Sequence, residues 1–263
     1  MKKYLVIGNP IDHSLSPKLH NYWLEKYNID AVYEKKEISE DNIAALIYEV
    51  KKEKINGINV TVPFKKLIIP FLDELSPLAN EAQSVNTIYK ENNKIIGHNT
   101  DIGGFELALK NTNYEVKNKT IFILGAGGVV PSIIVALKKM GVSKIIISNR
   151  TKEKAVNLKK IIPNLEILEW GEVPDFNMII NATSVGIKNN DEIKLDYASI
   201  GNNKFFYDII YNPPITNFLS NAKKFGNKTE NGKMMFIYQA SHAFAVWHKI
   251  LPDINEEVIK LLD

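Results

Sequence analysis

The chain has 263 residues, of which 45% are hydrophobic and 24% charged, and its formal net charge of +3 is mild, as in ordinary globular proteins. Its lysines are scattered among Glu and Asn rather than gathered in a stripe, which argues against nucleic-acid binding, and no apolar run is long enough to span a bilayer. The chain has no cysteine, so disulfides and thiolate chemistry are excluded and a reducing, cytoplasmic location is expected.

The first hundred residues predict an α/β unit with its own sheet. Apolar residues at strand or helix spacing predict alternating elements at residues 4–8, 17–27, 31–38, 43–54 and 55–62. The run at 4–8 is too short for a signal peptide and predicts a strand. Residues 85–88 and 95–97, joined by Glu91–Asn92–Asn93, predict a hairpin.

A second unit is expected to begin near Asp101, with a connecting helix at 102–109. Strands are predicted, with helices between them, at residues 120–124, 144–148, 166–168, 178–182 and 205–209. This alternation predicts a parallel, doubly wound sheet. The chain ends with a long apolar helix pattern at 235–251, whose surface needs a partner. If that partner is the first unit, the domains are 1–100 plus 236–263 and, between them, 101–235.

The predicted strand at 120–124 runs into a glycine turn, Gly125–Ala126–Gly127–Gly128. Glycines at this point allow a tight turn and let the backbone approach a pyrophosphate at a helix N-terminus. The third position of the dinucleotide fingerprint is normally Gly or Ala, but here it is Val130. From the glycines alone, an ordinary strand–turn–helix is an equally good interpretation.

The tip of the next strand carries Asn149, Arg150 and Thr151, with Lys154 one helical turn later. A site for NAD usually has Asp or Glu here, which binds the ribose 2′-hydroxyl. Basic and amide groups would instead attract a 2′-phosphate. The tip therefore predicts NADP, against the alternative of a solvated helix start in a lysine-rich chain.

Two serines lie near the predicted start of the first helix. Ser16 followed by Pro17 is a common helix start, with Ser16 as the N-cap. Ser14 adds a second hydroxyl that capping does not need. Two hydroxyls at a helix N-terminus suit a carboxylate, because that end carries positive partial charge.

Further polar residues follow apolar strands in the first unit. Alternation puts Asn59 and Thr61 on one strand face, and Lys65 follows after Pro63. Two more polar tips occur at 85–87 and 98–101. Solvated lysines and turn-forming Asn and Asp are the simpler interpretation of each tip alone. Several such tips in one unit are what a substrate cleft in an α/β protein requires.

Eight segments in order resemble the motifs of the shikimate dehydrogenase family. They lie at residues 14–17, 59–65, 84–87, 97–101, 125–128, 149–151, 181–186 and 238–240, and the similarity covers essentially the whole chain. The resemblance implies an N-terminal α/β substrate domain completed by the C-terminal helices, and a Rossmann-type doubly wound NADP-binding domain between. It also implies reversible, NADPH-dependent reduction of 3-dehydroshikimate to shikimate, a step towards chorismate and the aromatic amino acids.

The resemblance also implies roles for individual residues. Lys65 and Asp101 would be the catalytic pair, meeting in the cleft between the domains. The residues that would bind the substrate are Ser14, Ser16, Thr61, Asn86, Asp101, Tyr211 and Gln239. The residues that would contact NADP are Gly125, Ala126, Gly127, Gly128, Val129, Asn149, Arg150, Thr151, Lys154, Ile209 and Gly232. No metal is expected. The chain differs from the family pattern at Val130, Met234 and Asn217.

Two other functions are weighed against this one. A quinate/shikimate dehydrogenase using NAD would carry an acidic residue near Asn149, and this chain has none there. A dinucleotide-binding regulator without catalysis would have no use for Lys65 and Asp101 together with a full set of polar cleft residues. The expected partners are small molecules, with neither nucleic acid nor membrane, and the expected assembly is a monomer or a homodimer.

Overall fold

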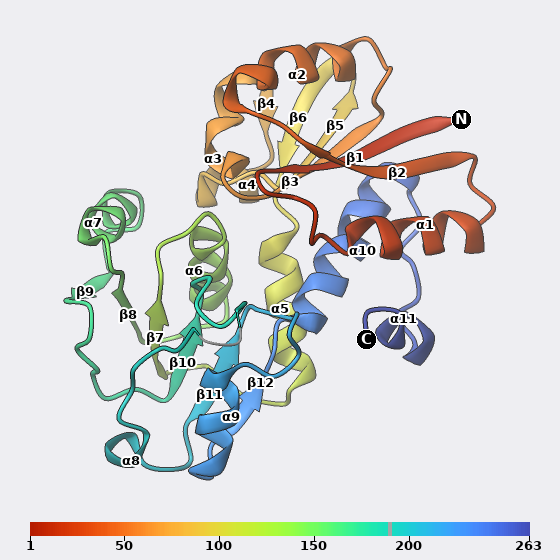
Figure 1. The fold of residues 1–263 in the computed structure, drawn as a ribbon. Coiled ribbons are helices and arrows are strands. Elements are labelled where there is room, and N and C mark those ends of the chain that lie inside the picture. Colours follow the sequence, from red (N-terminus) through yellow and green to blue (C-terminus); the bar gives the residue numbers. More distant parts are fainter. Residues whose placement is uncertain (189–190) are drawn as a thin grey trace. The chain divides into compact units, whose positions relative to one another are not determined.

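The computed structural model describes residues 1–188 and 191–263. The chain divides into two compact units (Figure 1). The first unit contains residues 1–104 and 237–263, and the second contains residues 105–236. In the described ranges, no helix combines the length and the apolar character needed to cross a membrane.

The first unit is built on a six-stranded mixed sheet in the order β2-β1-β3-β5-β6-β4. Its strands are β1 (Lys2–Gly8), β2 (Ala31–Glu37), β3 (Gly57–Val60), β4 (Glu74–Leu75), β5 (Thr87–Glu91) and β6 (Lys94–His98). β1 runs parallel to β2 and β3, whereas β5 runs antiparallel to β3 and β6. The β5–β6 hairpin turns at Asn92 and Asn93, both with positive φ, as a tight hairpin requires.

Alternation along β1 sends side chains to two different layers of the first unit. Leu5 and Ile7 join an aliphatic core with α2 (Ile43–Lys51), which lies on one face of the sheet (Figure 1). Tyr4 points to the other face, where its ring lies 5.0 Å from that of Trp247 in α10 (Lys233–His248). α1 (Ser16–Lys26) packs there too, through Trp23.

Four shorter or linking helices complete the elements that bear on the first unit. They are α3 (Phe64–Leu67), α4 (Pro77–Ala82), α5 (Asp101–Asn111) and α11 (Glu256–Lys260). Short 3₁₀ turns lie at Glu40–Asn42 and Ile69–Phe71. The chain passes from the first unit to the second within α5, and back within α10.

The second unit is a six-stranded, fully parallel sheet. Its strands are β7 (Thr120–Leu124), β8 (Lys144–Ser148), β9 (Glu166–Leu168), β10 (Met178–Asn181), β11 (Phe205–Asp208) and β12 (Lys228–Glu230). Their order is β12-β11-β10-β7-β8-β9. Numbered from β7, this is the strand order of the doubly wound dinucleotide fold, with its switch point between β7 and β10. The predicted fold class is confirmed.

Helices cover both faces of the parallel sheet. They are α6 (Val130–Lys139), α7 (Lys152–Ile161), α8 (Tyr197–Ile200) and α9 (Asn217–Lys224), with the end of α5. Phe206 points to a core shared with Phe218 of α9, and its neighbour Tyr207 points the opposite way, towards Phe105 of α5. Val130 is fully buried at the start of α6, so the larger side chain at the third fingerprint position is accommodated in the core.

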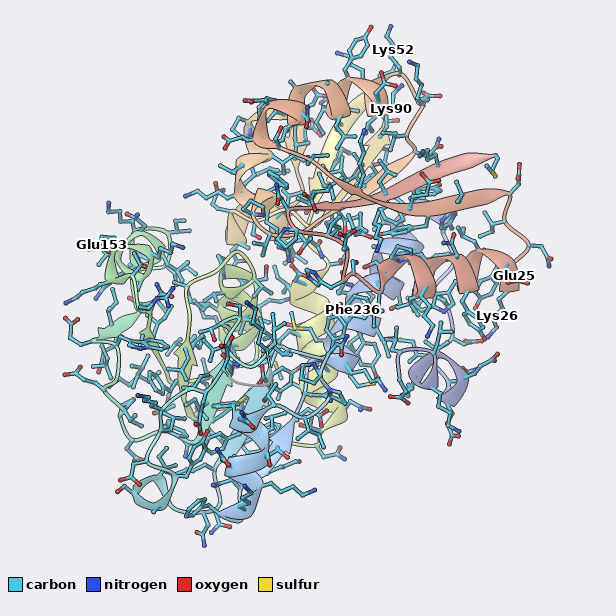
Figure 2. All side chains as sticks on the ribbon, in the orientation of Figure 1. Glu25, Lys26, Lys52, Lys90, Glu153 and Phe236 are labelled. Atoms are coloured by element: carbon cyan, nitrogen blue, oxygen red, sulfur yellow. The ribbon has the colours of Figure 1, made fainter. Side chains whose placement is uncertain are left out.

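Most charged side chains of the described residues lie on the outside of the two units. Glu25, Lys26 and Lys52 are exposed in the first unit and Glu153 in the second (Figure 2). Many lysines pair with carboxylates, for example Lys90 with Glu53 at 2.6 Å. This pairing fits the mild net charge of the chain.

Candidate active site

The sheet of the first unit brings several predicted residues to one edge. β1 and β3 are parallel and end there, β5 starts there because it runs antiparallel to β3, and β6 ends there in turn. Across this edge Thr87 is the register partner of both Asn59 and His98. The segments that follow β1, β3 and β6, and the one that precedes β5, therefore gather at one place.

Lys65 and Asp101 form a buried ion pair in the first unit. Lys65 Nζ donates to Asp101 Oδ2 at 2.6 Å, and the two side chains are only 10% and 6% exposed. Asp101 is the first residue of α5, where the helix dipole favours a negative charge. The main chain at Lys65 is fixed as well, since its carbonyl accepts from Val85 N at 2.8 Å. The predicted contact between these two side chains is confirmed, whereas their place in a cleft between the domains and their catalytic roles stay predictions.

Asn86 is the centre of the hydrogen bonds around this pair. Its Nδ2 lies within hydrogen-bond distance of Thr100 Oγ1 (2.8 Å), Asp101 Oδ1 (3.0 Å) and Gln239 Oε1 (3.3 Å). Its Oδ1 accepts from the Thr100 amide at 2.7 Å. The Asp101 carboxylate is therefore held by Lys65 on one oxygen and by Asn86 on the other. Gln239 reaches the same cluster from α10, 153 positions along the chain from Asn86.

A second row of buried polar side chains, Tyr33, Asn59 and Thr87, is hydrogen-bonded to Asn86. Asn59 donates to the Asn86 carbonyl at 3.0 Å and to Thr87 Oγ1 at 3.1 Å, and it accepts from the Tyr33 hydroxyl at 2.7 Å. Burial raises the pKa of Tyr33 well above its ordinary value, and a hydrogen bond with Ser16 opposes that rise. The row therefore links Ser16 to the Lys65–Asp101 pair within one unit.

The predicted site set omitted four members of this network, Tyr33, Asn59, Thr87 and Thr100. Asn59 gave a signal in the sequence as an amide inside an otherwise apolar strand, and Thr87 and Thr100 lie in the predicted polar tips at 85–87 and 98–101. Tyr33 resembles an ordinary core aromatic in its strand pattern.

The predicted cap of the first helix is wrong. α1 begins at Ser16 itself, its N-cap position is Leu15, and no side chain caps it. The Ser16 amide instead donates to Ser14 Oγ at 3.3 Å. Pro17 follows directly and has no N–H to satisfy, which lets the helix begin one residue earlier than a Ser16 cap would allow. Ser14 is thus the hydroxyl that supports the helix start, and Ser16 is buried.

Thr61 and Tyr211, the remaining predicted substrate residues, lie in different units. Thr61 follows β3 at the same sheet edge, and its methyl group lies close to Gly8, where an added Cβ would be 2.7 Å away. Tyr211 lies in the second unit and stacks on Phe236, with ring centroids 4.5 Å apart.

The glycine turn of the second unit lies at the switch point of the sheet. Gly125 has a φ of +108°, and an added Cβ would lie 2.6 Å from the Ala182 carbonyl oxygen at the end of the adjacent strand. Gly127 is exposed, and a Cβ there would meet nothing closer than 4.0 Å. Gly125 is therefore needed for packing, whereas Gly127 leaves the backbone open to a ligand. No side chain caps α6, whose N-terminal end carries positive partial charge.

The strand tip after β8 holds the glycine turn in place. Asn149 Oδ1 accepts from the Ala126 amide at 3.0 Å, and its Nδ2 donates to the Thr151 carbonyl at 2.7 Å. The side chains of Arg150 and Lys154 are exposed. The chemistry of these residues fits a dinucleotide with a 2′-phosphate: Asn149 shapes the turn, and the two exposed cations can pair with a phosphate.

Ile209 and Gly232 pack directly against each other. The Ile209 amide donates to the Asn181 carbonyl at 3.0 Å, and an added Cβ at Gly232 would lie only 2.0 Å from the Ile209 carbonyl oxygen. Only glycine fits at position 232 with this backbone. The two predicted cofactor residues are therefore in direct contact in the second unit.

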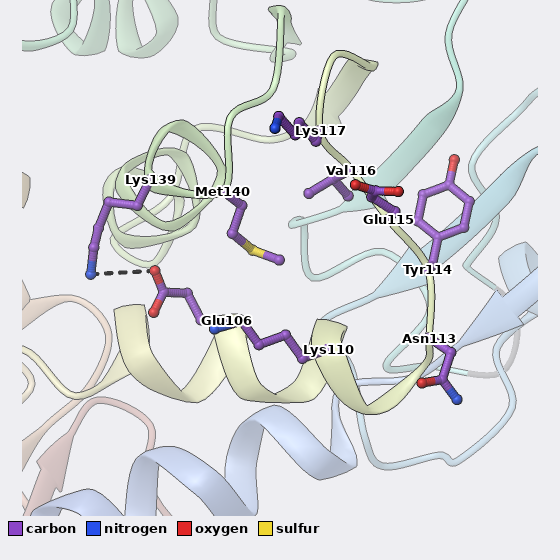
Figure 3. Close-up of a pocket in the computed structure, with 9 residues that line it drawn as sticks. All are labelled: Glu106, Lys110, Asn113, Tyr114, Glu115, Val116, Lys117, Lys139 and Met140. Atoms are coloured by element: carbon purple, nitrogen blue, oxygen red, sulfur yellow. Dashed lines mark ion pairs between the residues drawn. The ribbon is translucent and has the colours of Figure 1, made fainter.

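A surface hollow of about 470 Å³ lies at the other end of the parallel sheet (Figure 3). It is lined by the end of α5, the segment before β7 and the end of α6, with a Lys139–Glu106 ion pair at 3.3 Å on its rim. These segments precede the strands, whereas ligands of such sheets bind beyond the carboxyl ends. The hollow is therefore not assigned to the cofactor. Across the described residues, no group of three or more His, Asp or Glu side chains is placed to hold a metal.

Comparisons with known proteins agree with this architecture. Residues 6–88 match the family model for the shikimate dehydrogenase substrate binding domain, and residues 106–214 match the model for shikimate / quinate 5-dehydrogenase. A protein named shikimate dehydrogenase (NADP(+)) from Pelagibacter ubique (strain HTCC1062) is 64% identical over 262 residues, which cover 100% of this chain and 99% of that protein.

Solved structures extend the agreement to three dimensions. The crystal structure of shikimate dehydrogenase from Aquifex aeolicus has a TM-score of 0.90 at 38% identity, covering 100% of this chain and 97% of that one. A shikimate 5-dehydrogenase from Thermus thermophilus, solved in complex with NADP(H) and shikimate, has a TM-score of 0.89 at 30% identity, covering 100% and 98%. From its sequence and its fold, the chain belongs to the shikimate dehydrogenase family.

Proposed function

We propose that the protein is an NADP-dependent oxidoreductase that interconverts 3-dehydroshikimate and shikimate. The observation that supports this most strongly is the buried Lys65–Asp101 ion pair at 2.6 Å, surrounded by Asn86 and Gln239 at one sheet edge. A buried ion pair costs desolvation free energy, so a role beyond stability is a reasonable inference for it. The substrate site would lie in the first unit and the cofactor site in the second.

The first unit would bind the substrate through its carboxylate and hydroxyl groups. Ser14 and Ser16 offer hydroxyls at the N-terminus of α1, where positive partial charge favours a carboxylate. Thr61, Asn86 and Gln239 would bind substrate hydroxyls, and Tyr211 of the second unit stays a predicted substrate residue. Amide and hydroxyl side chains both donate and accept, so each can match a hydroxyl in either orientation.

Lys65 would act as the general acid in the reduction and as the general base in the reverse reaction. When bound, NADPH supplies a hydride to the ketone carbon of 3-dehydroshikimate. The ketone oxygen then gains negative charge, which the Lys65 ammonium can stabilise while donating a proton from Nζ. Asp101 would hold the ammonium in place and accept from a neighbouring substrate hydroxyl. In the reverse direction Lys65 would take the hydroxyl proton back.

The second unit would hold NADP at the carboxyl ends of β7 and β8. The turn from Gly125 to Val129 would approach the pyrophosphate, and Arg150 and Lys154 would pair with the 2′-phosphate. Asn149 and Thr151 would line the adenosine end, with Ile209 and Gly232 further along the sheet edge. We further propose a cytoplasmic enzyme that acts as a monomer or a homodimer.

An absorbance assay at the nicotinamide band tests the proposed function. Purified protein is mixed with shikimate or quinate, each with NADP⁺ or NAD⁺. We expect NADP⁺ to be reduced rapidly with shikimate, and the cofactor to be reduced much more slowly in the other three combinations. Equal rates with quinate and NAD⁺ would favour the broader quinate/shikimate activity, and no reduction in any combination would contradict a dehydrogenase.

Replacing the two serines should separate carboxylate binding from helix stability. Ser14→Ala and Ser16→Ala should each raise the KM for shikimate about 10-fold or more, because a hydrogen bond to a charged group contributes about 1.5–3 kcal/mol. Ser14→Ala should also cost up to about 1 kcal/mol of unfolding free energy, since Ser14 Oγ accepts the Ser16 amide. Steady-state kinetics and thermal unfolding measure the two effects.

Asn255→Ala is the matched control for the lost helix support. Asn255 caps α11 by accepting from Val258 N at 3.1 Å, and it is not among the predicted site residues. This variant should lower the melting temperature and leave the KM for shikimate unchanged. If both serine variants behave like Asn255→Ala, the hydroxyls are structural and do not bind the substrate.

A further inference from the structure

A buried polar cluster joins two loops at the carboxyl edge of the parallel sheet. Its members Asn181, Asp208 and Thr216 are at most 3% exposed. Asn181 and Asp208 are the last residues of β10 and β11, which are neighbours in the sheet. Thr216 follows eight positions after Asp208, at the start of α9.

The Asp208 carboxylate accepts three hydrogen bonds from different parts of the chain. Oδ1 accepts from Asn181 Nδ2 at 3.1 Å and from the Ile210 amide at 3.0 Å, and Oδ2 accepts from Thr216 Oγ1 at 2.7 Å. Both ends of the loop 209–216 are thus tied to one buried carboxylate. The loop between them carries Ile209 and Tyr211.

Asn181 ties the neighbouring loop to the same cluster. Its Nδ2 also donates to the Val185 carbonyl at 3.0 Å, and its Oδ1 accepts from the Thr183 amide at 3.0 Å. Gly186, with a φ of +113°, packs on the methyl group of Thr216, since an added Cβ would be 3.2 Å from Thr216 Cγ2. The loops after β10 and β11 are therefore fixed to each other as well as to the sheet.

Burial disfavours the ionised form of the Asp208 carboxylate. Burial raises the pKa of Asp208 to about 6 from an ordinary value near 3.8. Between these values the folded chain keeps a proton that the unfolded chain has released, so this group makes folding stability fall as the pH rises through that window. Tyr197 and Tyr207, whose pKa values Asp208 also affects, stay protonated in this window, since burial raises both pKa values further above it. At neutral pH the ionised carboxylate therefore contributes less to folding stability than its protonated form would.

We propose that Asn181, Asp208 and Thr216 form a latch that sets the position of Ile209 and Tyr211, with Asp208 as a positioning residue for the dehydrogenase reaction. The proposal rests on the proposed function, because Ile209 and Tyr211 are the predicted contacts with cofactor and substrate. An ionised carboxylate accepts from three donors at once without supplying a donor of its own. An apolar or amide side chain cannot do this, so the loop would shift.

The test uses the full chain with Asp208→Asn, Thr216→Val and Thr216→Ser. Asp208→Asn and Thr216→Val should each lower kcat/KM for shikimate by roughly 10- to 100-fold, since small misplacements of positioning groups have effects of this order. Thr216→Ser keeps the hydroxyl and should stay close to the wild type. Kinetics are compared at a temperature at which each variant is fully folded, so that a loss of stability does not account for a loss of activity.

Hydrogen exchange of the backbone amides at 209–216 supplies a readout independent of activity. Exchange should become faster in Thr216→Val and Asp208→Asn and stay unchanged in Thr216→Ser. Thr216→Val also removes the cap of α9, so Asp196→Ala, which removes the cap of α8 in the same unit, is the matched control. The control should lose a similar amount of thermal stability with normal kcat/KM and normal loop exchange.

Two results overturn the latch. One is folded Asp208→Asn and Thr216→Val proteins with kcat/KM within about 3-fold of the wild type. The other is unchanged exchange at 209–216 in both variants. A wild-type chain without shikimate-dependent turnover would contradict the proposed function instead, and the exchange measurement would still decide whether the latch exists.

Discussion

Lys65→Met is expected to lower kcat for shikimate oxidation by about 10²–10⁴-fold, the usual contribution of general acid–base catalysis. Methionine keeps the length of the side chain but cannot carry a proton or stabilise charge on the substrate oxygen. The affinity for NADP should change little, because the predicted cofactor residues lie in the other unit. Lys66→Met is the control, since Lys66 is the exposed neighbour in the same short helix.

Asp101→Asn should cost a comparable factor, because it removes the charge that holds the Lys65 ammonium. The double variant should be little worse than the worse single variant, since residues that act as one unit have non-additive effects. If the two losses multiply, Lys65 and Asp101 act independently and the proposed pair is wrong. Near-normal turnover of Lys65→Met would make Lys65 a structural residue.

The thermal stability of each variant must be measured together with its kinetics. Removing one partner of a buried ion pair can destabilise a protein by about 3–5 kcal/mol. In Lys65→Met the Asp101 carboxylate keeps its hydrogen bond from Asn86 at 3.0 Å, which limits this loss. Kinetics are therefore compared at a temperature where each variant remains fully folded.

Arg150→Ala is expected to weaken NADP binding by roughly 10- to 150-fold, since a charge-assisted hydrogen bond contributes about 1.5–3 kcal/mol. NAD lacks the 2′-phosphate, so its binding should hardly change. The structure supports the selection of Arg150 for this test, because its side chain is exposed while Asn149 is engaged in hydrogen bonds to Ala126 and Thr151. Titration of nicotinamide fluorescence with NADPH and NADH measures both affinities.

Lys159→Ala is the matched control for the Arg150 variant. It removes one positive charge from the exposed side of the last turn of α7, the helix that follows the strand tip. It should leave both affinities near those of the wild type. Equal losses of NADPH and NADH affinity in Arg150→Ala would contradict the assignment of this tip to the 2′-phosphate.

The regular elements could be predicted from the sequence because local periodicity decides them. The strands of the parallel sheet predicted at 120–124 and 144–148 occur with those limits, and the hairpin turns at the predicted asparagines. β4 and β12 lie outside the predicted strands. β4 has only two residues and shows no detectable period, and β12 is a polar run, Lys228–Thr229–Glu230, at the edge of the parallel sheet.

The catalytic pair could be predicted only by resemblance, since Lys65 and Asp101 are 36 positions apart. The hydrogen bonds around this pair are even harder to predict from the sequence. Asn86 meets Gln239 across 153 positions, and the helix start at Ser16 depends on the Ser14 hydroxyl rather than on a Ser16 cap. Such contacts follow from the packing of distant segments, which periodicity does not reveal.

Isotope transfer shows whether the protein moves a hydride from NADPH to the ketone carbon and whether Lys65 is needed for it. The protein is mixed with 3-dehydroshikimate and NADPH that carries deuterium at both C4 positions of the nicotinamide, and the product is analysed by mass spectrometry. We expect shikimate that carries one deuterium on the carbon of the former ketone, formed rapidly by the wild type and by Lys66→Met and far more slowly by Lys65→Met. Unlabelled shikimate, or no shikimate from the wild-type protein, would show that the protein does not transfer a hydride from NADPH to this substrate.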